Sequence, residues 1–537
     1  MNFIGEIYNK KELGLVGDDV ACVEQVFRKW GTAGFARLRG AFAFTLVDGD
    51  KTYIVRDQFG SIPVYYHLST TGKLLVSDRV LDLLDQGVPR ILSRQGLLSY
   101  LSYGCACTPL TLIEDVVAVP QGHFALVQGG KAELHRYWMP DFKPGEWTQD
   151  SAQEAVTAAF RESVDLQMHY NGEAVPAAFL SGGIDSSSIV AMMRKLYDGE
   201  IRTYCVKHDD DKTEESVWAR KVADCNHTRH MELHLSDAML KEHMLDAVSS
   251  YDQPTVDGVN FWFATKLVTE AGERMIFSGE GGDELFAGYW RFAKHQIAYK
   301  WSRRFKCIGS GLWGGLVGST LESLAPNEKV RKLGELLHLK TDPYTLPRRI
   351  YSDSQVLAFL RPELRERPTE FQKLFLDEAI PGKKDLVNRI SWLEMQTVTP
   401  DMWLRDGYQD ACANALGMRT PILDVKLAEV LYTIPGALKC TPEYLKPLLV
   451  RAAGDGMPLA CATRRKMGFS LPFQRYFTGE LKGLIDEFLK GENLALFDSE
   501  AIRALGRLYR AGRVNWSRVW ILFVIEFWCK LNRIGLA

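Results

Sequence analysis

The stretch FLSGGIDSSSIV, Phe179–Val190, constrains the fold of this chain more than any other feature. The apolar run Val175–Leu180 predicts a strand, a serine- and glycine-rich turn follows it, and Ser186–Leu196 predicts a helix. Such a turn lets backbone N–H groups and a helix N-terminus face an anion, and its serines add hydroxyl donors. The residues that we expect around a bound phosphate are Leu180, Ser181, Gly182, Gly183, Ser186 and Ser187.

An acidic residue inside this turn adds a second condition. Asp185 would be repelled by a bare polyphosphate, so its presence predicts a divalent cation between its carboxylate and the phosphate. A second glycine-rich loop, MIFSGEGGDELFAGYWRF at Met275–Phe292, again follows a short apolar run and carries three carboxyl groups. Parallel sheets bind ligands at the C-terminal ends of their strands. We therefore predict that Asp185 and Asp283 share one Mg²⁺, and that Glu280 is a base or a substrate-orienting group.

Two patterns divide the chain. Up to about Trp138, short β-type runs between turn signals predict a layered, largely antiparallel sheet: Ala41–Val47, Thr52–Arg56, Val64–Leu68, Lys73–Ser77 and His123–Val127. Met139–Trp147 is the predicted linker. Beyond it, alternating helices and strands predict a parallel α/β sheet: Ser151–His169, Val175–Leu180, Ser186–Leu196, Thr203–Lys207, Glu214–Cys225 and a short run at 230–235. From about Ala293 the pattern is mainly helical. The predicted domains are residues 1–140 and 148–537.

Composition excludes several classes of protein. A net charge of −2 gives no electrostatic reason to bind nucleic acid or an anionic membrane. No CxxC pair occurs, so neither a zinc site nor a disulfide framework is predicted. The most apolar runs, Gly311–Gly318 and Val519–Trp528, are shorter than the roughly 20 residues that cross a bilayer, and the second predicts a buried C-terminal helix. With no signal-peptide pattern at its N-terminus, the chain is expected to be cytoplasmic.

These motifs together resemble one family. SGGIDSS is similar to the PP-loop of ATP pyrophosphatases, which cleave ATP to AMP and pyrophosphate. SGEGGDE is very close to the SGEGSDE-type loop of asparagine synthetases, and Asp252–Phe263 resembles the segment that precedes it there. Arg419–Leu427 resembles the family's ARVPFLD segment, but Gly417 and Met418 stand where asparagine synthetases usually carry Glu-Ala. Because of this departure, the resemblance does not extend to the amino-acid specificity of the family.

A third block has two lysines in places that match the family, within KPLLVRAAGDGMPLACATRRKMGF. The resemblance implies that Lys446 contacts ATP phosphates and that Lys466 lies at the reacting centre. A fixed ammonium there stabilises the charge that develops when pyrophosphate leaves. The nucleotide-binding residues implied in addition to those of the first loop are Val206, Ser278 and Gly279.

The N-terminal region resembles the family's glutaminase domain. GEIYN at Gly5–Asn9 is in register with three further segments of that domain: Arg39–Asp48, Arg56–Tyr66 and Leu74–Leu84. Glutamine-using members expose a cysteine nucleophile as their first residue, whereas this chain has Asn2 at position 2 and its first cysteine is Cys22. A thiol acyl transfer needs an activated nucleophile. We therefore expect a degenerate glutaminase domain that serves as a scaffold.

The resemblance implies an Ntn-hydrolase-like sheet domain, followed by an adenine-nucleotide α-hydrolase-like synthetase domain with a helical C-terminal part. It also implies ATP and Mg²⁺ as cofactors. Members that lack the cysteine, such as β-lactam synthetases and lasso peptide cyclases, attack the acyl-adenylate with an amine of the same substrate. β-Lactam-forming members have a tyrosine where this chain keeps Glu280.

We therefore expect macrolactam formation in a lasso peptide precursor with an acidic side chain and a free N-terminal amine. A separate leader-peptide-binding protein and a protease are the expected protein partners. An ammonia-dependent asparagine synthetase, or another small-molecule amide ligase, and a catalytically silent scaffold remain as alternatives.

Overall fold

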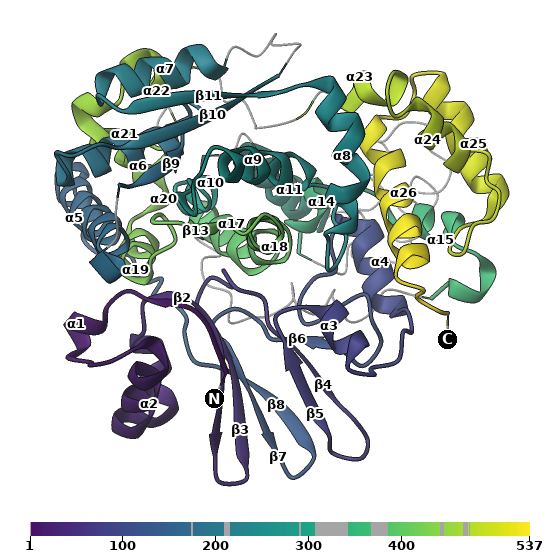
Figure 1. Ribbon diagram of the computed structural model, residues 1–537, viewed down its shortest axis with the longest axis horizontal. Coiled ribbons are helices and arrows are strands. Elements are labelled where there is room, and N and C mark those ends of the chain that lie inside the picture. The colour runs from purple at the N-terminus through teal and green to yellow at the C-terminus, as the bar shows by residue number, and fades with distance from the viewer. Residues whose placement is uncertain are drawn as a thin grey trace.

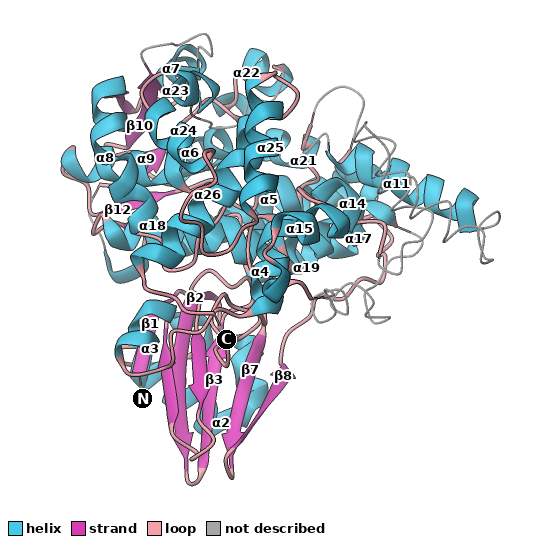
Figure 2. Ribbon diagram, turned by 90° about the vertical axis from the view of Figure 1, so that its right-hand side faces the viewer, coloured by secondary structure: helices cyan, strands magenta, loops and turns pink. Residues whose placement is uncertain are grey.

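The computed structural model describes residues 2–172, 175–208, 215–288, 291–306, 342–366, 385–440, 445–464, 471 and 473–536. Lys466 and the apolar run Gly311–Gly318 lie outside these described residues. The N-terminal strands form one end of the molecule, and a helix-rich body forms the other (Figures 1 and 2).

Two antiparallel sheets make up the N-terminal region, as the sequence predicted. One has the strand order β1-β2-β3-β7-β8 and the other β5-β4-β6. Their bounds are β1 (Asn2–Ile7), β2 (Gly40–Asp48), β3 (Lys51–Arg56), β4 (Tyr65–Leu68), β5 (Leu74–Ser77), β6 (Val117–Ala118), β7 (His123–Gln128) and β8 (Lys131–Arg136). Strand β2 alternates between two small cores: Phe42 and Phe44 pack with the helix at Asp19–Trp30, and Ala43 packs between the sheets.

Helices interrupt these strands at places where the sequence predicted only β-type runs and turns. They are α1 (Lys10–Leu13), α2 (Asp19–Trp30), η1 (Gly31–Arg37), α3 (Val80–Asp85) and α4 (Arg94–Tyr103). Helix α2 begins at Asp18, whose side chain accepts a hydrogen bond from the Ala21 N–H. Both α2 and α4 bury apolar residues, so they belong to the cores and are not surface loops.

The second region is built on a parallel sheet of order β11-β10-β9-β12-β13. Its strands are β9 (Ala177–Phe179), β10 (Arg202–His208), β11 (Arg229–Leu235), β12 (Met275–Phe277) and β13 (Gly417–Arg419). The chain builds outward from β9 through β10 to β11, and then returns to add β12 on the opposite side of β9. The boundary between β9 and β12 is therefore a topological switch point, where open α/β sheets bind ligands.

Helices surround this sheet and form the C-terminal part. They are η2 (Tyr170–Gly172), α5 (Gln149–Met168), α6 (Ile184–Leu196), α7 (Glu215–Cys225), α8 (Asp237–Ser249), α9 (Val259–Glu270), α10 (Gly282–Leu285), α11 (Arg291–Lys306), α14 (Thr345–Arg348), α15 (Asp353–Phe359), η3 (Pro362–Leu364), α17 (Leu386–Gln396), η4 (Thr399–Trp403), α18 (Leu404–Ala413), α19 (Val425–Thr433), α20 (Gly436–Lys439), α21 (Pro447–Ala453), η5 (Gly454–Gly456), α22 (Leu459–Thr463), α23 (Phe473–Thr478), α24 (Lys482–Phe488), α25 (Ser499–Arg510) and α26 (Trp516–Leu531).

Helix α26 contains the predicted C-terminal helix, and most of its side chains are buried. Within the described part of the chain, no helix is both long and apolar enough to cross a bilayer.

Buried ion pairs join the two regions. Arg419, at the end of β13, is 1% exposed and donates two hydrogen bonds of 2.8 Å to the carboxylate of Glu6 in strand β1. Arg39 donates in the same forked way to Asp424, with both distances 3.0 Å. Forked pairs of this kind fix orientation as well as distance. Glu6 belongs to the GEIYN motif, so part of that motif binds the second region to the first.

Candidate active site

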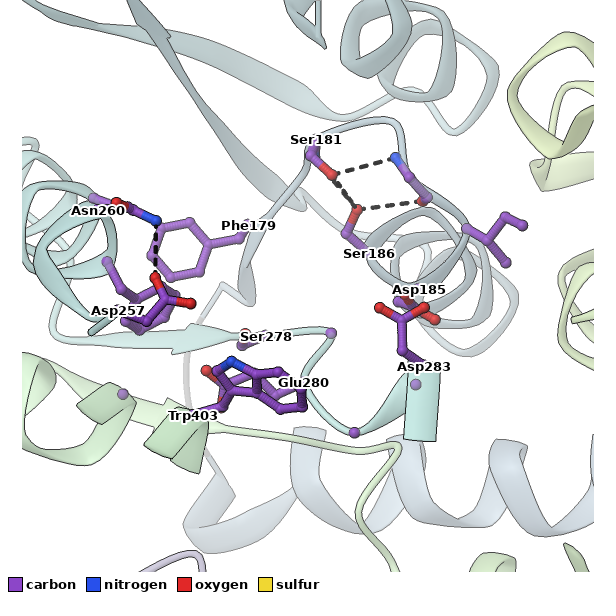
Figure 3. A pocket seen from close by; sticks show the side chains of 18 of the residues that line it. Phe179, Ser181, Asp185, Ser186, Asp257, Asn260, Ser278, Glu280, Asp283 and Trp403 are labelled. Carbon is purple, nitrogen blue, oxygen red and sulfur yellow. Dashed lines mark hydrogen bonds between the residues drawn. The ribbon is translucent and has the colours of Figure 1, made fainter. Parts of the chain in front are cut away.

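A cavity of about 1400 Å³ opens at the switch point between β9 and β12 (Figure 3). Most of the predicted site residues line it: Leu180, Ser181, Gly183, Asp185, Ser186, Val206, Ser278, Gly279, Glu280, Asp283 and Lys446. Gly182 and Ser187 do not line it. Lys466 lies outside the described residues, so its place relative to the cavity stays a prediction.

The turn between β9 and α6 forms one wall of the cavity. Gly183 is the N-cap of α6, and the Ser181 and Ser186 hydroxyls lie 3.4 Å apart at the helix N-terminus (Figure 3). Gly182 has φ 69°, and a Cβ there would lie 2.5 Å from the backbone of Trp218. Gly182 therefore shapes the turn, and its neighbours face the space where an anion would bind.

An arginine that the sequence analysis did not single out also reaches this wall. Arg464 lines the cavity and donates a hydrogen bond of 3.3 Å from Nη2 to the Ser181 carbonyl oxygen. Arg464 lies within the block that contains Lys446 and Lys466, two residues before Lys466, and this position was the sequence signal that could have identified it.

Two carboxylates from the two loops converge on one cation. The Lys446 Nζ lies 2.5 Å from both carboxylate oxygens of Asp185 and 2.6 Å from Asp283 Oδ1. Lys446 is 2% exposed and has φ 54°, a left-handed backbone conformation that is uncommon outside glycine. A side chain at Gly282 would place its Cβ 2.1 Å from Asp185 Oδ1, so the close approach of the two loops requires glycine there.

The same convergence fits a divalent metal. Mg²⁺ is held in proteins by one or two carboxylates together with substrate phosphates and water. Asp185 and Asp283 share a single cation position beside the helix N-terminus that would bind phosphate, and Lys446 shows that a positive charge is stable there. The residues present therefore fit Mg²⁺ bound together with a nucleotide.

Glu280 lies on the β12 loop, away from the serine-rich turn, and lines the cavity (Figure 3). Burial, together with the neighbouring carboxyl groups of Glu284 and Asp406, raises the pKa of its carboxyl group to about 8. Its Oε2 has no hydrogen-bond partner within the described residues. A carboxyl group with a pKa near neutrality can accept a proton from a reacting amine.

The opposite wall comes from segments that carried no local motif. Trp403, Asp406 and Gly407 line the cavity from the end of η4 and the start of α18, at the i, i+3, i+4 spacing of one helix face. Asp257 lines it from the loop before α9. Asp257 falls in a segment that resembles the family, but the residues on α18 became visible only in the fold.

Comparison with known proteins shows what the chain is similar to. The family model described as asparagine synthase matches residues 155–530, and the glutamine amidotransferase domain model matches residues 1–138. Asparagine synthetase [glutamine-hydrolyzing] 1 of Bacillus subtilis is 26% identical over 99% of this chain and 85% of its own length. A putative asparagine synthetase of Mycobacterium bovis is 26% identical over 98% of this chain and 83% of its own length.

The match to a solved glutamine PRPP amidotransferase from B. subtilis covers 52% of this chain and 60% of that protein, at 9% identity and a TM-score of 0.19. A TM-score this low supports no structural argument.

Proposed function

Because the chain belongs to the asparagine synthase family, an ATP-dependent carbon–nitrogen ligase family, we propose that it activates a substrate carboxylate as an acyl-adenylate and joins it to an amine. Pyrophosphate leaves in the first half-reaction and AMP in the second. One observation carries the proposal: the serine-rich turn, the Asp185–Asp283 pair and Glu280 all border a single cavity at the switch point of the sheet.

The chain's own residues divide the work of adenylation. The N–H groups at the start of α6, with Ser181 and Ser186, bind and orient the phosphates of ATP. Asp185 and Asp283 would hold Mg²⁺, which would neutralise phosphate charge. Lys446, which pairs with Asp185 and Asp283, lies beside the space for the phosphates, where its charge stabilises the departing pyrophosphate.

Glu280 serves the second half-reaction. An amine must lose its proton as it attacks the carbonyl carbon. Glu280 lies in the cavity with a raised pKa, and its Oε2 has no hydrogen-bond partner among the residues that the structure describes. The proton passes from the amine nitrogen to the Glu280 carboxylate, the C–N bond forms, and the bond to AMP breaks.

The finer proposal is macrolactam formation in a peptide, with the acidic side chain and the N-terminal amine on the same substrate. The size of the cavity supports a substrate larger than a free amino acid beside ATP, and Trp403, Phe473 and Trp516 provide apolar wall for a peptide. Ring closure benefits from holding both reacting groups together. On this proposal, the partners are a precursor peptide, a leader-peptide-binding protein and a protease.

An ammonia-dependent asparagine synthetase is the second candidate, because the two relatives reported above, each 26% identical, are named as glutamine-hydrolyzing asparagine synthetases. One experiment separates the candidates. The purified chain is incubated with ATP and Mg²⁺ and either aspartate with ammonium, or a synthetic peptide with a free N-terminus and an internal Asp or Glu. A peptide that loses the mass of one water, with pyrophosphate release, supports cyclisation, and asparagine supports the second candidate. If no substrate leads to pyrophosphate release, the remaining alternative is the catalytically silent scaffold.

A further inference from the structure

The charges that line the cavity are unevenly distributed. Its described lining residues include two cationic side chains, Lys446 and Arg464. Lys446 pairs with Asp185 and Asp283, and Arg464 lies 4.0 Å from Glu215. The remaining lining carboxyl groups are Asp257, Glu280, Glu284 and Asp406. We call the part of the cavity lined by Asp257, Glu280, Asp406 and Trp403 the acidic end.

Asp406 is the most buried carboxyl group of the acidic end. It is 2% exposed, and its Oδ2 accepts a hydrogen bond of 2.6 Å from the Thr255 hydroxyl. The nearest cation, the Arg405 Nη2, lies 3.5 Å from Oδ1, which is longer than a charge-assisted hydrogen bond. Burial raises the pKa of Asp406 to about 7 despite Arg405, so the anionic form lacks sufficient compensation from the described protein.

An independent observation is the state of Asp410, one turn further along α18. Asp410 is 0% exposed, and neither of its carboxyl oxygens has a hydrogen-bond partner within the described residues. Burial raises its pKa well above the ordinary value, and the charges that act on it are those of Asp406, Glu280 and Asp257. Asp410 therefore lies close enough to the acidic end to interact with its carboxyl groups, and its burial among them favours the neutral form of its own side chain.

The wall of the acidic end also suits an organic cation. A side chain at Gly407 would place its Cβ 2.9 Å from the Glu280 Oε1, so glycine lets Glu280 lie against the backbone next to Asp406. Trp403 lies on the same helix face, one turn before Gly407. An indole face attracts an ammonium or guanidinium group. The Trp403 ring already has one such contact, because the Arg348 guanidinium carbon lies 5.4 Å from its centroid.

We propose that the acidic end binds a positively charged group of the substrate, a primary ammonium on an apolar or aromatic body, with Asp406 as the residue that selects for the charge. The proposal deepens the proposed function and rests on it, because it assigns the amine partner of the amide bond to this end of the cavity. It accounts for the three carboxyl groups of the acidic end, which would repel the phosphates of ATP.

The test uses two small probes of nearly the same shape, 2-phenylethylammonium and the neutral 2-phenylethanol. Their dissociation constants are measured on the full chain by ligand-observed NMR. We expect the ammonium to bind about tenfold more tightly than the alcohol. Asp406→Asn keeps the size of the side chain and can still accept from Thr255, and it should remove most of that difference while leaving affinity for the alcohol unchanged.

Asp401→Asn is the matched control. Asp401 is a second buried carboxyl group that accepts hydrogen bonds from a threonine, Thr108, and Arg405 also acts on its charge, but it does not line the cavity. This variant should keep the preference for the ammonium. Equal binding of the two probes to the wild-type chain would overturn the proposal even if Asp406→Asn failed to fold, and so would an unchanged preference in Asp406→Asn.

ATP separates this proposal from the proposed function. Stabilisation of the wild-type chain by ATP with Mg²⁺, measured as a rise in Tm, together with pyrophosphate release from a carboxylate substrate, reports the adenylation site. If both occur and the ammonium binds no more tightly than the alcohol, the proposed cation site is refuted and the proposed ligase function is supported. If the ammonium binds more tightly than the alcohol but no substrate leads to pyrophosphate release, the cation site is supported and the proposed ligase function is refuted.

Discussion

The two ends of the cavity differ in how their charges are balanced. At the phosphate end, two carboxylates share the Lys446 ammonium and a helix N-terminus faces the same space. At the acidic end, carboxyl groups meet one another and an indole ring, and their pKa values rise. Under the proposed function, the phosphate end would bind ATP and the acidic end would bind the amine group of the substrate.

The largest effect is expected at the phosphate end. Asp185→Ala and Asp283→Ala should each reduce pyrophosphate release below detection, because each removes a ligand that positions Mg²⁺ on the phosphates and leaves Lys446 with one partner fewer. The assay is pyrophosphate formation with saturating carboxylate substrate. Near-normal turnover in both variants would place the metal site elsewhere.

The second-largest effect is expected for Lys446→Met. It keeps the length of the side chain and removes the charge, which typically costs about 3–4 kcal/mol of transition-state stabilisation, or a hundredfold to a thousandfold in kcat. Lys446→Arg should rescue only part of the loss, because a planar guanidinium cannot replace a compact ammonium between two carboxylates. A kcat of Lys446→Met within threefold of wild type would show that the lysine does not contribute to adenylation.

At the acidic end, Glu280→Gln should separate the half-reactions. Pyrophosphate release should persist within about tenfold, and amide formation should fall by about a hundredfold, the typical contribution of a general base. Since burial raises the pKa of Glu280 to about 8, the carboxylate that accepts the proton becomes the major form only above that pH. The wild-type rate of amide formation should therefore rise with pH through about 8 and level off above it, and the variant should lack this rise.

A smaller effect is expected at the junction of the two regions. Glu6→Gln leaves the buried Arg419 without its anionic partner, which should lower the free energy of unfolding by about 3 kcal/mol. Glu12→Gln is the matched control, because Glu12 is 55% exposed where it pairs with Arg39 and should change stability by less than about 1 kcal/mol. Equal denaturant midpoints for the two variants would contradict a structural role for Glu6.

No effect at all is expected from glutamine. Cys22, the first cysteine of this chain, is buried in the core under the first sheet, and burial raises the pKa of its thiol, so it is unsuited to nucleophilic attack. Glutamine added to the purified chain should release no glutamate above background. Measurable glutamate would refute the expectation that the N-terminal region is a scaffold.

The phosphate end was largely predictable from the sequence because its parts are local. A strand, a glycine-rich turn and a helix start occupy consecutive residues at Phe179–Val190, and the physics of anion binding acts within that span. The antiparallel and parallel sheets followed from hydrophobic periodicity in the same way. Lys466 remains a prediction from its motif alone.

The acidic end was not predictable because its residues come together only through the fold. Asp406 stands in a helix with no motif of its own, and its neighbour Glu280 is far away in sequence. Strand β13 was missed for a related reason: Gly417–Arg419 is three residues long and becomes a strand by pairing with β12. Gly182 was expected near the phosphate, but its contact with Trp218 on α7 could not be read from the motif.

The backbone contacts between the two regions set a limit on protein engineering. The Gly104 carbonyl oxygen accepts from the Val256 N–H at 3.1 Å, and the Ser102 carbonyl oxygen accepts from the Ile350 N–H at 2.7 Å. Val256 and Ile350 both line the cavity. A shortened enzyme that keeps only the nucleotide-binding part would therefore lose the support of two lining residues, and an N-terminal region grafted from a relative would reshape the space that the substrate occupies.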